Sequence, residues 1–153
     1  MYKISVKKIQ EEKHIENIQV LPLFSFNELN SSEIFTDSDI AQNKPLLIIY
    51  FHPECEFCSE QANEISQKIQ EFNPYQILYI SNARASAIDS FVNNYGLAGK
   101  VNIIFLQDKD LIFNDIFGRS GVPVSFVYNK NKELVKQFKG EAKIEELLKC
   151  LKE

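Results

Sequence analysis

The fold of this chain is decided by the stretch Leu46-Leu47-Ile48-Ile49-Tyr50-Phe51-His52-Pro53-Glu54-Cys55-Glu56-Phe57-Cys58. Its first six residues are apolar or aromatic, as in a central strand that is buried on both faces. Its last four residues hold two cysteines separated by two residues, directly before a helical pattern. A helix start presents unpaired backbone N–H groups and the positive end of the helix dipole, which favour the thiolate form of a cysteine placed there. We therefore interpret Cys55 and Cys58 as a reactive pair.

The composition bounds the class of protein. The 153 residues, with 44% hydrophobic and 25% charged side chains, fit one globular domain. The net charge of -4 comes from interspersed signs, which makes nucleic acid a poor candidate partner. No segment approaches the ~20 apolar residues of a membrane span, and no signal-peptide core follows the first residues. We expect a cytoplasmic protein, or a periplasmic or membrane-anchored one if a leader has been removed; the sequence leaves the oligomeric state open.

The cysteine count favours a catalytic over a structural pair. Three cysteines are too few for the disulfide scaffold of a secreted protein of this length. A disulfide that closes a four-residue loop would also restrain few unfolded conformations. The third cysteine, Cys150, lies beside an apolar stripe and is expected to be a small hydrophobic residue at the edge of the core.

Apolar segments recur at spacings that suit alternating strands and helices. Residues 1–20 are expected to be an N-terminal extension and 21–153 the domain. Strands are predicted at 20–26, 46–51, 76–80, 102–106, 124–128 and 134–138, the last two forming an antiparallel hairpin, and 31–43 is predicted to be a polar connection. Helices are predicted from Cys58 to Phe72, over 88–95 and over 144–151, with a short helix or turn at 111–117. This order predicts an α/β fold with a mixed central sheet flanked by helices.

Three motifs together carry a family resemblance: Lys44-Pro45 before the buried strand, the Cys55/Cys58 pair, and Gly121-Val122-Pro123 before a later strand. With them the chain resembles the thioredoxin fold and, within it, the bacterial TlpA-like thiol–disulfide oxidoreductases, which are related to the alkyl hydroperoxide reductase and thiol-specific antioxidant proteins. The resemblance covers about residues 21–152. A cysteine pair alone is a weak motif, but the pair together with a distant Val-Pro is fairly specific.

The resemblance implies roles for these residues. Cys55 would be the exposed attacking thiol and Cys58 the more buried resolving thiol, which releases the substrate from a mixed disulfide. Pro123 would follow a cis peptide bond, which would place the Val122 backbone beside the cysteines to pair with an extended substrate segment. The implied partners are a protein disulfide or dithiol and an electron donor, with no cofactor.

The chain departs from thioredoxin itself in ways that affect the chemistry. Glu54 replaces the usual tryptophan, and Glu56-Phe57 replaces the usual Gly-Pro. Ile49 stands where thioredoxin keeps a buried acidic proton acceptor, so the route of proton removal from Cys58 is open. Because nearby negative charge disfavours a thiolate, we expect a relatively reducing pair, which acts as a reductant.

Proton handling near the thiols has two candidates, His52 and Glu56, although a histidine at a strand end is often only a solvated polar residue. No second cysteine pair or His-x-x-x-His run completes a zinc site, so no metal is assigned.

Two other functions compete with disulfide exchange. A thioredoxin-like copper-binding module would use Cys55, Cys58 and His52, since soft thiolates suit Cu(I); the other histidine, His14, lies outside the recognised region. A peroxidase of the peroxiredoxin type ranks lower, because the Thr-x-x-Cys signature is missing. Copper titration and peroxide consumption would separate these hypotheses.

Overall fold

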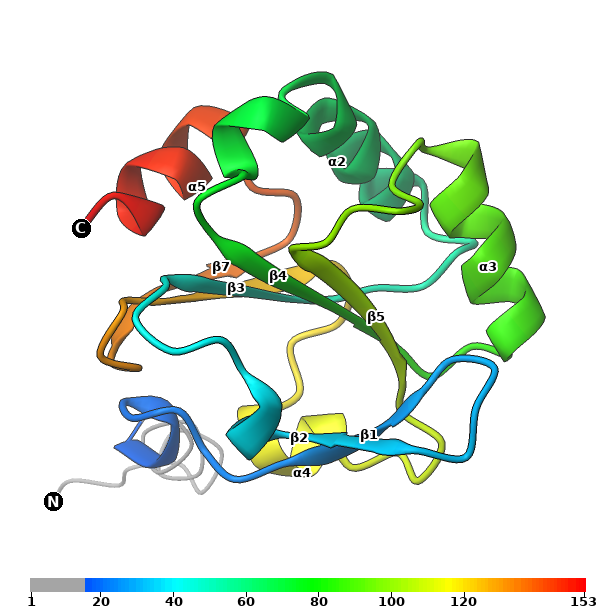
Figure 1. Cartoon of the computed structure of the whole chain (residues 1–153), viewed down its shortest axis with the longest axis horizontal. Helices are drawn as coiled ribbons and strands as arrows, with labels where there is room; N and C mark the ends of the chain where they lie inside the picture. Colours follow the sequence, from blue (N-terminus) through cyan, green and yellow to red (C-terminus); the bar gives the residue numbers. More distant parts are fainter. Residues whose placement is uncertain (1–15) are drawn as a thin grey trace, which may run out of the picture.

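The computed structural model describes residues 16–153 as one mixed sheet covered on both faces (Figure 1). Its seven strands are ordered β2-β1-β5-β4-β3-β6-β7. The strands are β1 (Ser25–Glu28), β2 (Ile34–Thr36), β3 (Leu46–Tyr50), β4 (Gln76–Ser81), β5 (Ile103–Gln107), β6 (Val124–Tyr128) and β7 (Leu134–Lys139). Strands β3, β4 and β5 are parallel, whereas β6, β7, β1 and β2 run antiparallel to their neighbours. The expected mixed sheet and the β6–β7 hairpin are confirmed.

Alternation along the central strands builds two separate hydrophobic cores. In β3, Leu47 and Ile49 face one core, whereas Leu46, Ile48 and Tyr50 face the other. All five residues of this strand are buried, because both faces of the sheet are covered. This explains why the sequence of β3 shows no polar alternation.

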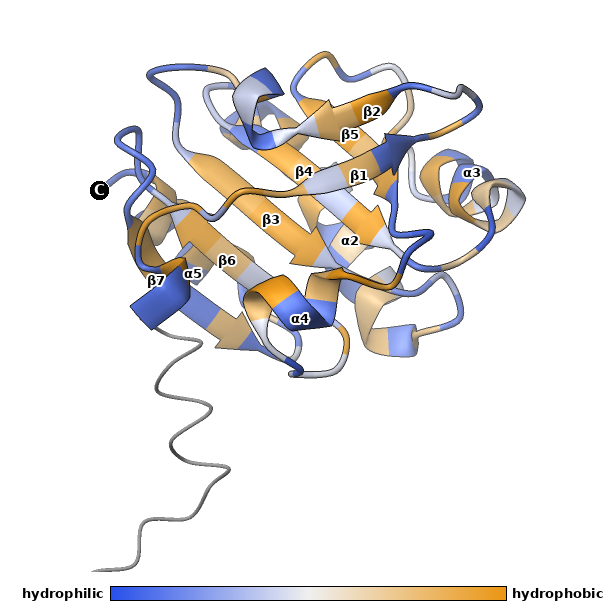
Figure 2. Ribbon diagram, turned by 90° about the horizontal axis from the view of Figure 1, so that it is seen from below, coloured by the Kyte–Doolittle hydropathy of each residue, from blue (hydrophilic) through white to orange (hydrophobic). Residues whose placement is uncertain are grey.

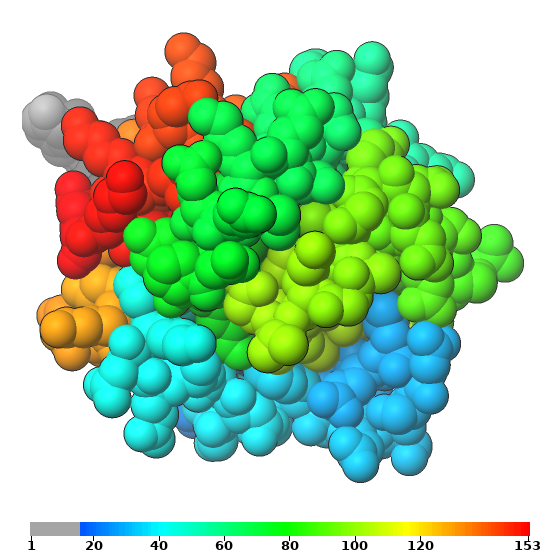
Figure 3. Space-filling model, turned by 45° about the horizontal axis from the view of Figure 1, so that its top comes forward, coloured from blue at the N-terminus to red at the C-terminus, as the bar shows by residue number. Residues whose placement is uncertain are grey.

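The first core lies between the sheet and three helices: α2 (Glu56–Gln67), α3 (Ala85–Asn94) and α5 (Ile144–Leu151). These helices form the upper layer in Figure 1, and Figure 3 shows them side by side on the surface. The second core lies under the short helix α4 (Phe113–Phe117), the β1–β2 hairpin and the 3-10 turn η1 (Asp37–Asp39). Figure 2 looks onto this face and shows the apolar central strands behind α4. The cysteine pair belongs to the first core.

Three expected boundaries were wrong. The strand expected at residues 20–26 is a strand only from Ser25 onward, and Val20 instead forms an isolated bridge with Glu133. The connection expected at 31–43 contains β2 and η1; only one residue of β2 is buried, which is too weak a pattern to recognise. The helix expected to continue to Phe72 ends at Gln67 and continues as the 3-10 turn η2 (Ile69–Phe72).

The η2 turn is held by a contact that local sequence does not reveal. The Asn102 side-chain amide donates hydrogen bonds to the carbonyls of Phe72 and Tyr75, at 3.0 and 2.9 Å. Asn102 lies 30 residues away from Phe72 along the chain. Because the carbonyls at a helix end lack partners within the helix, a distant amide can decide where and how the chain turns.

The segment before β1 is attached to the sheet by a buried tyrosine. Ile18 is buried, and its carbonyl accepts a hydrogen bond of 2.8 Å from the Tyr128 hydroxyl. We expect Tyr128→Phe to lower the free energy of unfolding by about 1–2 kcal/mol, because the Ile18 carbonyl would lose its partner in a buried position. Urea denaturation should show a lower midpoint with an unchanged slope. An unchanged midpoint would contradict a stabilising role for this hydrogen bond.

Candidate active site

Cys55 occupies the N-cap position of α2, where the chain leaves β3 through a tight turn. The Cys55 N–H donates to the His52 carbonyl at 3.0 Å and closes this turn. The Cys55 backbone is extended, and its sulfur accepts a hydrogen bond of 3.2 Å from the Cys58 N–H. A cysteine thus stands where serine, threonine or aspartate usually caps a helix. The geometry gives a thiolate at this position a backbone donor from the first turn of α2.

The two thiols differ in exposure. Cys58 is buried with 2% of its surface exposed, whereas Cys55 is half-buried, and both are free thiols. Burial raises the pKa of the Cys58 thiol well above its usual range, and the neighbouring Cys55 side chain raises it further, against a smaller opposing contribution from the His52 backbone. One thiol therefore meets solvent while the other is held protonated in the core.

A distant loop completes the site. The Val122–Pro123 peptide bond is cis, as expected from the sequence. The Cys55 thiol lies 3.8 Å from the Val122 carbonyl, which accepts a weak hydrogen bond from it. Strand β6 begins just beyond, and Val124 pairs with Tyr50 at the end of β3. The sheet register therefore brings residues 67 positions apart into contact at the cysteine pair.

The two candidate proton-handling residues lie on either side of Cys55. His52 is half-buried, and its Nδ1 atom accepts a hydrogen bond of 3.1 Å from the Glu54 N–H, so this nitrogen stabilises the turn. Glu56 is the first residue of α2 and is exposed. Phe57, which lies between the cysteines in the sequence, is also exposed.

Tyr79 is a residue of the core around Cys58 that the sequence reasoning missed. It lies on β4 directly beside Ile49 on β3, in the same hydrophobic core as Cys58. Among residues 16–153, the Tyr79 hydroxyl is the buried side-chain polar group that has no hydrogen-bond partner. Alternation along the predicted strand at 76–80 could have indicated on which face of the sheet Tyr79 lies, but not that its hydroxyl would lack a hydrogen-bond partner.

Gln61 joins the elements around the pair. It is buried on α2, and its amide donates to the Ser125 hydroxyl at 3.3 Å while its carbonyl accepts from the Ala142 N–H at 2.9 Å. It thereby connects α2 to β6 and to the segment before α5. This position stabilises the packing of the helix that carries both cysteines.

Metal ligands are not gathered in the part of the chain that the structure describes. No group of three or more histidine, cysteine, aspartate or glutamate side chains there could hold a metal ion. Cys55, Cys58 and His52 therefore do not form such a cluster in this structure, and His14 lies outside the described residues. Cys150 is half-buried on α5, at the edge of the first core, as expected.

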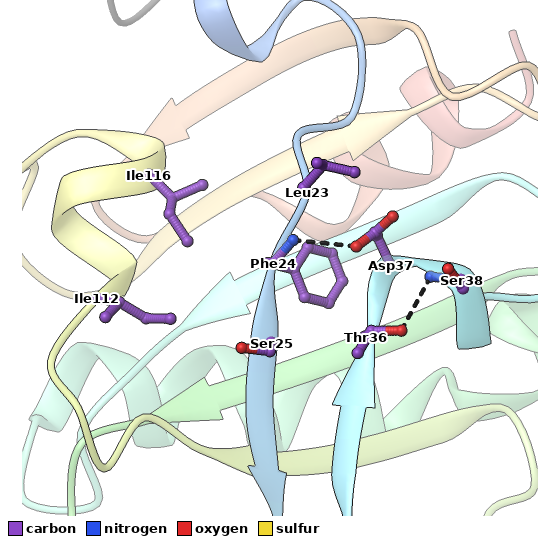
Figure 4. A pocket seen from close by; sticks show the side chains of 8 residues that line it. All are labelled: Leu23, Phe24, Ser25, Thr36, Asp37, Ser38, Ile112 and Ile116. Carbon is purple, nitrogen blue, oxygen red and sulfur yellow. Dashed lines mark hydrogen bonds between the residues drawn. The ribbon is translucent and has the colours of Figure 1, made fainter.

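A pocket of about 520 Å³ lies on the other side of the sheet from the cysteines (Figure 4). The side chains around it come from β1, β2, η1, α4 and their flanking residues: Leu23, Phe24, Ser25, Thr36, Asp37, Ser38, Ile112 and Ile116. Phe24 is buried in the second core, and the Asp37 carboxylate accepts a hydrogen bond from its N–H at 3.1 Å. This pocket is separate from the candidate active site.

Comparison with protein families now identifies the fold. The thioredoxin-like domain model matches residues 38–153. This chain belongs to the thioredoxin-like domain family. The matched region contains the cysteine pair and the Val122–Pro123 loop, and it confirms the thioredoxin-like fold expected from the sequence. No protein of curated function matches the sequence significantly.

Solved structures share the architecture at low sequence identity. A secreted disulfide oxidoreductase of Mycobacterium tuberculosis, homologous to DsbE of E. coli, is 22% identical with a TM-score of 0.71, covering 90% of this chain and 97% of that one. StoA of Bacillus subtilis is 12% identical with a TM-score of 0.65, covering 86% and 98%. The mitochondrial 2-Cys peroxiredoxin of Plasmodium falciparum is 17% identical with a TM-score of 0.68, covering 88% and 91%. At such identities the likeness establishes the fold.

Among residues 16–153, no helix combines the length and the apolar character needed to cross a membrane.

Proposed function

We propose that this thioredoxin-like domain is a thiol–disulfide oxidoreductase that reduces disulfides in other proteins through Cys55 and Cys58. The observation that carries the proposal is the asymmetry of the pair. Cys55 is accessible and accepts a backbone hydrogen bond at the start of α2, whereas Cys58 is buried three residues later. Disulfide exchange needs one thiol that reaches the substrate and a second that is protected until a mixed disulfide forms.

The proposed reaction has two exchange steps. The Cys55 thiolate attacks one sulfur of the client disulfide, forms a Cys55–client bond and displaces the other client sulfur, which takes up a proton. Cys58 then loses its proton and attacks the Cys55 sulfur. The Cys55–Cys58 bond forms, the Cys55–client bond breaks, and the departing client sulfur takes up a proton. The client gains two electrons and the protein pair loses two, so an external electron donor must restore the dithiol.

The proposed client-binding surface surrounds Cys55. Val122 is partly exposed, and its carbonyl is 3.8 Å from the Cys55 sulfur. An extended client segment would pair with the Val122 backbone, next to Pro123. His52 and Glu56, which flank Cys55, would deliver or accept the protons of the client sulfurs. The proposal assigns this activity to residues 21–153, with 1–20 as the extension.

The proposal predicts a reversible, reducing disulfide. Because burial keeps Cys58 protonated, the reduced form gains thiolate stabilisation at Cys55 alone, where the adjacent Glu54 and Glu56 carboxylates oppose the backbone donor of α2. We expect a reduction potential of about -270 mV, as in thioredoxin, rather than the value of about -120 mV of a strong disulfide oxidant. The measurement is equilibration with glutathione or dithiothreitol, followed by thiol alkylation and mass spectrometry.

The result of the redox equilibration tests both the exchange activity and its direction. A single two-electron transition of the Cys55–Cys58 pair supports disulfide exchange, and a strongly oxidising potential would contradict the reductant direction while keeping the exchange. If the two thiols never form a mutual disulfide, the oxidoreductase proposal fails, and copper titration becomes the next experiment.

A further inference from the structure

Gln61 and Ser125 form a buried polar pair between the two parts of the candidate active site. Gln61 on α2 and Ser125 on β6 are both buried, and the Gln61 amide donates a hydrogen bond of 3.3 Å to the Ser125 hydroxyl. Two apolar side chains could fill this space without the cost of burying polar groups. Because a hydrogen bond is directional, the polar pair fixes one placement of α2 against β6.

The same two elements carry the groups proposed to react with the client. Cys55 caps the start of α2, and Cys58 lies in its first turn. Val122 and Pro123 lead directly into β6. The Cys55 sulfur lies 3.8 Å from the Val122 carbonyl, so α2 and the β6 segment meet at the reacting sulfur as well as at the buried pair. Loss of the buried contact would therefore loosen the placement of the Cys55 sulfur relative to the Val122 backbone.

The connection between β7 and α5 braces both elements. The Ala142 N–H donates a hydrogen bond of 2.9 Å to the Gln61 side-chain carbonyl. The Gly140 N–H donates another, also of 2.9 Å, to the Pro123 carbonyl. Together with the buried pair, these bonds form a closed set of three that joins α2, the start of β6 and residues 140–142. Two of the three meet at Gln61, which makes it the residue that ties α2 into the set.

We propose that Gln61, through Ser125, is a positioning residue that holds the Cys55 sulfur where an extended client segment can both pair with the Val122 backbone and react. This inference rests on the proposed exchange function. A fixed placement leaves less motion to be lost when the client binds. The effect of the pair therefore falls on peptide clients, and small disulfides that need no pairing with Val122 do not depend on it.

The test compares two mixed disulfides that share one leaving group. One joins an extended peptide, through its single cysteine, to a nitrobenzoate thiol, and the other joins mercaptoethanol to the same thiol. The Cys55 thiolate attacks the peptide or mercaptoethanol sulfur and displaces the coloured nitrobenzoate thiolate, which is the better leaving group. Cys58 then loses its proton and attacks the Cys55 sulfur, and the released peptide sulfur takes up a proton. All proteins carry Cys150→Ser, so that the third cysteine does not react.

We expect Ser125→Ala to lower the second-order rate constant with the peptide by about 3-fold to 10-fold, as for the loss of one hydrogen bond, and to leave that with the mercaptoethanol compound unchanged. The loss should lie mainly in the peptide concentration at half-maximal rate. Ser125→Ala keeps the bond between Gln61 and Ala142, so it removes only the contact between α2 and β6. Gln61→Met removes both bonds at similar side-chain length and should show a loss at least as large. It carries the test if Ser125→Ala does not fold.

The matched control is Tyr128→Phe, which also removes a buried hydrogen bond, but in the second core. It should lower the urea midpoint and leave the ratio of the two rate constants unchanged. A parental ratio in Ser125→Ala and Gln61→Met would overturn the inference and leave the proposed function intact. Equal losses with both mixed disulfides would also overturn it, because a general structural role produces that result. A parent protein that releases nitrobenzoate without forming the Cys55–Cys58 disulfide would refute the proposed function, and the inference with it.

Discussion

Replacement of Cys55 by serine should abolish disulfide reduction, with a loss of about 10³-fold or more in rate, because a serine hydroxyl is not ionised at neutral pH and is a poor nucleophile toward sulfur. Cys58→Ser should behave differently. Its Cys55 still attacks, but no resolving thiol follows, so the protein should accumulate as a mixed disulfide with the client. The measurement is turnover of a disulfide-bonded peptide, together with the intact mass of the protein after acid quenching.

The different outcomes expected for Cys55→Ser and Cys58→Ser follow from the exposure of each thiol. Cys55 is half-buried and meets solvent, whereas Cys58 is 2% exposed. Cys150→Ser is the matched control, since it removes a third thiol from the far end of the chain and should leave turnover unchanged. If Cys58→Ser turned over as fast as the parent protein, or if Cys55→Ser formed the adduct instead, the assigned roles of attacking and resolving thiol would be wrong.

The sequence predicted the central part of the fold well, because its signals are strong and local. Strand β3 is apolar at every position, and the helix after it begins at the cysteine pair as expected. The loop at Val122–Pro123 was placed beside the cysteines by family resemblance, and the structure confirms both the cis bond and the proximity. Nothing in residue spacing alone would have joined segments so far apart.

What the sequence could not predict depends on distant contacts. Strand β2 is three residues long and only one of its side chains is buried, so its sequence carries little periodicity. The turn at the end of η2 is held by Asn102, and the position of Tyr79 beside Ile49 depends on the register of β4 against β3. These features exist only once the sheet has formed.

The buried position of Asp108 also depends on contacts that the sequence could not predict. Removal of its carboxylate should have a large effect on stability. An aspartate after a strand usually indicates a solvated turn, yet Asp108 is only 2% exposed. Its carboxylate accepts hydrogen bonds from the Tyr50 hydroxyl at 3.0 Å and from the backbone N–H groups of Ile112 and Phe113 at 2.9 and 3.2 Å. It thus joins the end of β3 to the start of α4.

We expect Asp108→Ala to lower the free energy of unfolding by about 3–5 kcal/mol, because three donors lose their acceptor in a buried position. That is a large fraction of the about 5–15 kcal/mol that stabilises a typical domain. Tyr50→Phe removes one of the three donors and leaves the two backbone bonds, so it should cost only about 1 kcal/mol. Asp89→Ala is the surface control: its carboxylate accepts one exposed hydrogen bond from Asn30, and the change should be within about 0.5 kcal/mol.

Urea denaturation of the three variants measures their losses in free energy of unfolding and ranks them. A loss in Asp108→Ala no larger than that in Tyr50→Phe would show that the backbone donors of α4 are satisfied in another way once the carboxylate is gone. Loss of stability in Asp108→Ala is expected to be independent of disulfide formation by the cysteine pair. Tyr50, which bonds to Asp108, lies in the second core, whereas the cysteines lie at the first. Asp108→Ala that is still folded should therefore form the Cys55–Cys58 disulfide. The hydrogen bonds of Asp108 at the end of β3 thus lie on the face of the sheet opposite to Cys58.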